Sequence, residues 1–223
     1  MKTTSREIWE ELRSVLKGST IDAILPSILF AVFNAVFDLK IAVYAAFGLA
    51  ILLGGLRLVR KQPWLYALTG LIGVGFAAGL ALLTRSAVSY FIPAIISSAL
   101  LILIALVSNL IGKPLAAWVS HLTRGWPLAW FWRQDVRPAY VSVTWIWALF
   151  FGVRLVIQIT LFQQGEAGTL AWVSTLLGWP VTVVVLIISY LYGIWRLRRL
   201  NGPGVHEFKV GKGPPWEGQT RGF

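Results

Sequence analysis

The sequence has no cysteine, and only two histidines and nine acidic residues among its 223 positions. Without cysteine there can be no disulfide framework, no thiolate metal site and no cysteine nucleophile. His121 and His206 both lie outside the long apolar runs, so no apolar run offers an imidazole to a haem or a buried metal, and no Ser-His-Asp set can form at one membrane depth. We therefore expect neither enzyme activity nor a cofactor.

Charge of either sign is also scarce. Charged residues make up 13% of the chain and hydrophobic residues 57%, with 12 Trp, whereas a soluble domain usually has about a quarter of its residues charged. The net charge of +11 comes from cations placed between apolar runs, not from a basic polar face. This pattern indicates a membrane protein that faces anionic lipid, and not a nucleic-acid-binding protein.

Six apolar runs are long enough to be membrane spans, which need roughly 20 residues each as helices. The sequence therefore predicts an all-α integral membrane protein with six transmembrane helices in a domain covering residues 20–200. The runs are Ile21–Phe37, Ile41–Val59, Trp64–Leu83, Val88–Ile111, Val141–Phe162 and Leu170–Trp195.

The distribution of cations predicts the orientation. Seventeen Lys and Arg fall on the side of the N-terminus, only Lys40 and Arg85 fall on the other side, and Arg154 lies inside a span. Because cations are retained in the cytoplasm, we expect both termini to be cytoplasmic. Arg57, a turn from the cytoplasmic end of its span, is expected to extend its side chain to the surface.

Two cytoplasmic segments have the pattern of helices that lie on the membrane. In residues 1–19, Thr4 and Glu7 form a capping box before an apolar helical face. In the linker 113–140 an apolar stripe, Leu115, Trp118, Val119 and Leu122, is followed by further aromatic residues. Indoles favour the headgroup zone, so we predict interfacial anchors at Trp9, Trp118, Trp126, Trp130 and Trp132. The alternative is a docking surface for a partner.

The tail 201–223 differs from both segments. It is rich in Gly and Pro, a composition that does not hold a helix. We expect it to be flexible or extended along another surface.

The two halves of the chain echo each other weakly. Gly55-Leu56-Arg57-Leu58-Val59 resembles Gly152-Val153-Arg154-Leu155-Val156, and Pro26 and Pro93 occupy similar places early in the first and fourth spans. Because three spans is an odd number, such halves would have opposite orientations in a three-plus-three inverted repeat, an arrangement common in transporters.

Arg154 is the one cation near the middle of a span, where it costs roughly 2.5 to 3.5 kcal/mol on insertion scales. It should therefore face a partner or a wet cavity. One interpretation is a structural pairing with Asp38 or helix carbonyls, and the other is a site for an anionic substrate or lipid headgroup. The candidate polar pocket at this depth contains Arg154, Gln158, Asn34, Asp38, Ser97, Ser98, Ser174 and Thr175.

Short motifs give the sequence a family resemblance. These are Leu25-Pro26, Gly112-Lys113-Pro114-Leu115, Trp147-Ala148-Leu149-Phe150-Phe151 and Tyr192-Gly193-Ile194-Trp195-Arg196. With the six-span layout they resemble bacterial intracellular septation protein A and, more closely, a bacterial membrane family numbered 3159 among domains of unknown function. The resemblance implies a bacterial inner-membrane protein tied to the cell envelope or division. It offers no counterpart for Arg154 and lends no functional site.

Three functions are consistent with these features. The first is a non-enzymatic envelope or division scaffold. The second is a small transporter or lipid- or anion-binding protein that uses the pocket around Arg154. The third is an accessory subunit of a larger membrane complex. Expected partners are a bilayer containing anionic lipids and either another membrane protein or further copies of the chain in a homo-oligomer.

Overall fold

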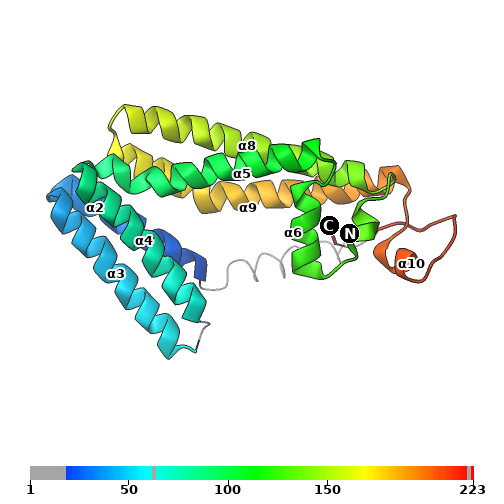
Figure 1. Cartoon of the computed structure of the whole chain (residues 1–223), viewed down its shortest axis with the longest axis horizontal. Coiled ribbons are helices and arrows are strands. Elements are labelled where there is room, and N and C mark those ends of the chain that lie inside the picture. The colour runs from blue at the N-terminus through cyan, green and yellow to red at the C-terminus, as the bar shows by residue number, and fades with distance from the viewer. Residues whose placement is uncertain (1–18, 62–63, 220–221) are drawn as a thin grey trace. The chain divides into compact units, whose positions relative to one another are not determined.

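The computed structural model describes residues 19–61, 64–219 and 222–223, and the regular elements in this part of the chain are all helices (Figure 1). The N-terminal amphipathic helix expected within residues 1–19 lies outside this range, apart from its last residue. The elements are α2 (Ser19–Val36), α3 (Leu39–Val59), α4 (Trp64–Thr84), the 3-10 helix η1 (Ala87–Phe91), α5 (Ile92–Leu110), α6 (Leu115–Arg124), α7 (Leu128–Phe131), α8 (Arg137–Gln163), α9 (Ala167–Leu200) and α10 (Val205–Lys209).

Within the described residues, four helical stretches are long and apolar enough to cross a membrane. They are Leu39–Val59, Ala87–Leu110, Arg137–Gln163 and Ala167–Leu200. Helices α2 and α4 contribute shorter apolar stretches, Leu25–Val36 and Leu68–Thr84. The protein is thus an all-helical, multi-pass membrane protein. Each predicted apolar run coincides with a helix, while the count of six spans stays a prediction.

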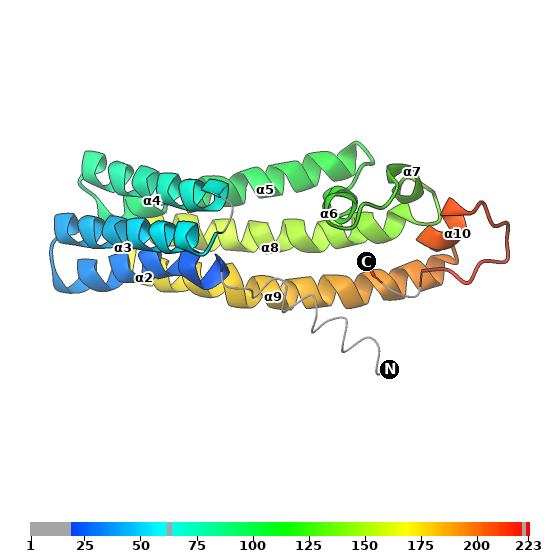
Figure 2. The same ribbon diagram turned by 90° about the horizontal axis from the view of Figure 1, so that it is seen from below.

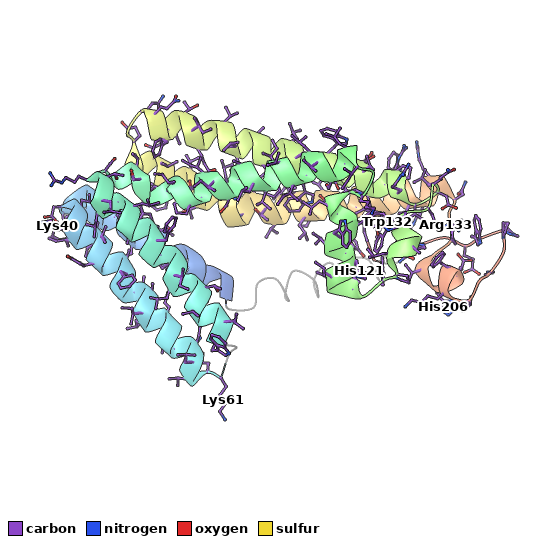
Figure 3. All side chains as sticks on the ribbon, viewed as in Figure 1. Lys40, Lys61, His121, Trp132, Arg133 and His206 are labelled. Atoms are coloured by element: carbon purple, nitrogen blue, oxygen red, sulfur yellow. The ribbon has the colours of Figure 1, made fainter. Side chains whose placement is uncertain are left out.

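Local sequence signals account for where several helices begin and end. Asp38 precedes α3, and its Oδ1 accepts a hydrogen bond of 2.9 Å from the N–H of Ile41, which satisfies one of the free donors at the helix start. Gly125 ends α6 with a φ of 66°, a left-handed conformation that suits glycine. Lys40 and Lys61 lie at opposite ends of α3 (Figure 3).

The chain divides into two compact units, and the division cuts through α5, α8 and α9. Unit 2 contains α2, α3, α4, η1, the first part of α5 up to Ser98, and residues 154–181 of α8 and α9. Helices α2, α3 and α4 lie side by side in it (Figure 2). Alanines at positions 42, 46 and 81 are fully buried in its core, which lets these helices approach closely. Phe30 of α2 stacks on Tyr90 of η1 with ring centroids 4.0 Å apart.

Unit 1 contains the rest of α5, α8 and α9 together with α6, α7 and α10. We call residues 113–136 and the described part of 201–223 the cap. Its two segments pack together: Trp130 of the linker is fully buried and donates to the Pro203 carbonyl of the tail at 2.8 Å. Phe223 of the tail stacks on Tyr140 of α8 at 4.3 Å. The expectation that the tail holds no helix is wrong for Val205–Lys209, which form α10.

Candidate functional site

Three of the residues predicted for a polar pocket come together in unit 2. Gln158 of α8 is fully buried, and its Oε1 accepts a hydrogen bond of 2.8 Å from Ser98 Oγ of α5. Its Nε2 donates to Ser174 Oγ of α9 at 3.4 Å. A buried amide in an apolar bundle needs such partners, so this group joins three helices through polar side chains.

The other predicted pocket residues do not join this group. Asp38 is exposed and caps α3, and Ser97 donates to the Pro93 carbonyl of its own helix at 2.7 Å. In the described part of the chain no hydrogen bond links Gln158 to Asn34 or Thr175, which are half-buried. Among the described residues, hydrogen bonds therefore join three of the eight predicted residues, Ser98, Gln158 and Ser174.

Arg154 lies one helical turn before Gln158 and is half-buried. Its Nε is buried and has no hydrogen-bond partner among the described residues, and no ion pair joins it to Asp38 there. The structural pairing considered from the sequence is thus absent from the described part of the chain. A guanidinium at this depth is costly in an apolar bundle.

A cavity of about 270 Å³ lies elsewhere in unit 2, and none of the eight predicted residues lines it. Its wall comes from α2, α3, α4 and the junction of η1 with α5, and Arg57 is the charged residue in it. Arg57 is 9% exposed, so the prediction that it reaches the surface is wrong. Small residues explain the difference: Nη1 of Arg57 lies 3.8 Å from where a Cβ would stand at Gly70, a position that leaves room for the guanidinium.

The sequence carries one local signal for this cavity, a row of small residues on α4. Gly70, Gly73 and Ala77 of α4 follow each other at helical spacing, and all three line the cavity. Small residues on one helix face usually indicate close helix packing. Here the same feature leaves open space instead.

Helix α6 of the cap leaves most of its apolar stripe exposed. Val119 is 51% exposed and Leu122 79% exposed, while Ala117 and Ser120 on the other side are buried. His121 also faces inward, and its Nδ1 donates to the carbonyl oxygen of Trp126 at 2.6 Å. A helix of a soluble protein would bury the apolar side, so this orientation fits an apolar neighbour outside the chain.

The predicted tryptophan anchors have different roles in the structure. Trp130 is fully buried, and its Nε1 donates to the Pro203 carbonyl at 2.8 Å, so it is a core residue of the cap and not an interfacial anchor. Trp118 is 37% exposed and packs on the half-buried Trp132 at 5.8 Å, which keeps both next to the exposed face of α6. Trp126 is half-buried under Arg124, and Trp9 lies outside the described residues.

The tail of the cap is held by one carboxylate. Glu207, 7% exposed, accepts hydrogen bonds from the backbone N–H groups of Gly204, Glu217 and Gly218 at 2.9, 2.9 and 3.1 Å. These bonds lower the pKa of Glu207 to about 2, and the Lys212 ammonium, 3.2 Å away, adds to the effect. The same contact raises the pKa of Lys212.

Arg133 ties the linker to this tail. It forms a forked pair with Asp135, with N to O distances of 2.9 and 2.7 Å, and this pair raises the pKa of Arg133. Its guanidinium also lies over the ring of Trp216 at 5.3 Å and that of Phe208 at 6.0 Å. The two ring contacts have no local sequence signal, because Phe208 and Trp216 are far from Arg133 along the chain. Figure 3 marks Arg133 beside Trp132, and His206 on α10.

Residues 17–199 match the model of a family described as a protein of unknown function, DUF3159. The chain belongs to the DUF3159 family. The match covers α2 to α9 with the linker half of the cap, and it ends before α10. No curated protein and no solved structure matches the chain. The family identified from the sequence motifs is thus confirmed, whereas the likeness to septation protein A stays a prediction.

Proposed function

We propose that this DUF3159 protein is a non-enzymatic scaffold of the bacterial inner membrane, with six spans and a cytoplasmic cap held at the bilayer surface. The observation that carries the proposal is the reversed orientation of α6, whose apolar residues face outward while Ser120 is buried. An apolar face next to Trp118, in a chain with a net charge of +11, suits the headgroup layer of an anionic bilayer.

The rest of the cap supports a scaffold role. Trp130 and Arg133 join linker and tail through side-chain contacts, and Glu207 holds the tail to itself, so the cap is a defined surface and not a pair of loose loops. A surface of this kind, fixed next to the membrane, can hold an envelope or division protein in position. The family resemblance to septation protein A points to the same setting.

A complementation experiment tests this role. In a bacterium lacking its own copy of the gene, we expect the fluorescently tagged wild type to restore normal cell length and to gather at the division site. Leu122→Glu places a charge on the exposed face of α6 and should abolish both effects, whereas Gln164→Glu, which adds a charge at an exposed position between α8 and α9, should not. Full rescue by Leu122→Glu would contradict the scaffold proposal.

The orientation is tested by single cysteines in this cysteine-free chain. Thr123, Gln164 and Gly213 are exposed, and each lies in a different connection or surface segment. An impermeant thiol reagent added to intact cells should label only Gln164→Cys, because positions 123 and 213 are proposed to be cytoplasmic. Labelling of Thr123→Cys from outside would overturn the six-span arrangement, and with it the three-plus-three inverted repeat that forms its finer part.

A second candidate function, binding of an anionic lipid or solute, is favoured by Arg154. A half-buried guanidinium whose Nε has no described partner is suited to a phosphate or carboxylate oxygen. If Arg154 binds such a ligand, adding it should raise the Tm of the wild type and not that of Arg154→Leu. Equal Tm shifts in both proteins would leave Arg154 without a role in binding.

A further inference from the structure

The cavity of unit 2 differs from the predicted pocket because its polar and apolar parts are separated along the helices. Its lining follows α3 for two turns from Ala50 to Arg57 and α4 for two turns from Thr69 to Ala77. Arg57 lies next to Gly70, while Ala77 belongs to the apolar core cluster that contains Tyr90 and Phe91. The cavity therefore has a cationic end and an apolar end.

We propose that this cavity binds the phosphate headgroup of an anionic phospholipid, with the first part of an acyl chain directed towards Ala77. The inference keeps the ligand class of the second candidate function, an anionic lipid, but places it in this cavity, so it does not depend on Arg154. Arg57 is the phosphate ligand, because it is the charged residue that lines the cavity.

Charge and chemistry favour a phosphate. Among the described residues, the cavity wall contains one cation, Arg57, and no Asp or Glu. A guanidinium carries five N–H donors, so Arg57 can keep its contacts within the protein and still bind phosphate oxygens. A zwitterionic headgroup would bring an ammonium into a site that has no acid to receive it.

Size and position favour a lipid. Pockets that enclose a drug-sized ligand measure roughly 300–1,000 Å³, and this cavity, at about 270 Å³, suits a headgroup and a short length of chain. Arg57 stands in the last turn of α3, just before Arg60 and Lys61. Cations at the end of a membrane helix lie at headgroup depth, where the phosphates of one leaflet are concentrated.

Gly73 allows the cavity to be closed without touching the cation. A Cβ at Gly73 would meet no heavy atom within 4 Å, so a leucine there can project into the open volume. Gly48 of α3 is a matched control, because it also has open space around it, is exposed, and does not line the cavity. Both substitutions replace a helical glycine by a better helix former, so neither should unfold its helix.

The experiment measures the Tm of the detergent-solubilised full chain during titration with phosphatidylglycerol, phosphatidylcholine and glycerol phosphate. We expect phosphatidylglycerol to raise the Tm of the wild type, Gly48→Leu and Arg154→Leu alike. The concentration needed should rise at least about tenfold for Gly73→Leu and for Arg57→Lys, which keeps the charge and loses the fork. Phosphatidylcholine and glycerol phosphate should have little effect.

Three results would overturn the proposal in distinguishable ways. Unchanged titrations of Gly73→Leu and Arg57→Lys, with loss of the shift in Arg154→Leu, would move the site to Arg154 and leave the second candidate function standing. An equal response to glycerol phosphate and to the lipid would make the ligand a soluble anion. No shift with any compound would remove both the site and the second candidate function.

Discussion

Buried polar side chains have different surroundings in the cap and in the cavity of unit 2. In the cap, Trp130 Nε1 has the Pro203 carbonyl at 2.8 Å, and the Glu207 carboxylate accepts three backbone N–H groups. In unit 2, Arg57 is equally buried, but it lines an open volume of about 270 Å³.

This difference separates structure from candidate function. A buried polar group whose hydrogen bonds are all made within the chain mainly specifies a fold. A buried cation beside open space keeps the capacity to bind something else. We therefore assign the cap's polar contacts to architecture and look for a ligand only in unit 2, and the following predictions test that assignment.

Removing Trp130 should have the largest effect. Trp130→Ala leaves a large void in the cap core and should lower the free energy of unfolding of the cap by about 3–5 kcal/mol. Trp130→Phe keeps most of the volume but leaves the Pro203 carbonyl unpaired, at a cost of about 1–3 kcal/mol. Limited trypsin digestion of the detergent-solubilised chain should show faster cleavage after Lys209 and Lys212 than in the wild type. Cleavage should be fastest in Trp130→Ala and intermediate in Trp130→Phe. Cleavage as slow as in the wild type would mean that Trp130 does not hold the tail.

Glu207 should make the cap sensitive to acid. Its pKa in the folded cap is about 2, below its ordinary value of 4.5, so its contribution to stability is complete above pH 4.5 and is lost as the pH falls towards 2. Hydrogen exchange at the amides of Gly204, Glu217 and Gly218 should lose protection over this range.

Two variants give the acid prediction its control. Glu207→Gln cannot accept all three backbone bonds, so these amides should exchange faster at every pH, without the acid transition. Glu217→Gln removes a carboxylate that is 84% exposed, and the transition should remain. A transition of equal size in Glu207→Gln would assign it to another group.

The membrane helices could be predicted almost completely from the sequence. A membrane span requires a long apolar run, and such a run is recognisable from consecutive residues alone. The Ser98–Gln158–Ser174 contact was also within reach, since polar residues in apolar spans must find one another. The similar depth of Ser98, Gln158 and Ser174 in their spans was enough to predict that they lie close together. The predicted pairing of Asp38 with Arg154 is not seen among the residues that the structure describes, because a carboxylate before a helix can also serve as an N-cap. Asp38 makes that local bond, to the N–H of Ile41.

The cap and the cavity could not be predicted, for a shared reason. Trp130 and Pro203 are 73 residues apart, and no periodicity reports that the linker and a Gly- and Pro-rich tail fold together. Tryptophans near a membrane usually indicate the headgroup zone, so Trp130 was misplaced by a rule that suits Trp118. The cavity depends on which small residues face each other across α3 and α4, and composition alone does not say whether they meet or leave space.

Substitution of Gln158 should have the smallest effect. It tests, within unit 2, whether a buried polar group that is bonded within the chain is structural only. Its bonds to Ser98 and Ser174 are made within the chain, so by the reasoning applied to the cap it is architectural. Gln158→Leu removes these bonds but adds an apolar side chain, and Ser98 keeps its bond of 3.0 Å to the Ala94 carbonyl. Polar contacts between membrane helices average about 0.6 kcal/mol, so the Tm should fall by only a few degrees. The Tm shift caused by phosphatidylglycerol should stay as in the wild type, measured in the same titration. A strong loss of that shift in Gln158→Leu, with the cavity variants unaffected, would place the ligand beside α5, α8 and α9 and reverse the roles assigned to the two sites.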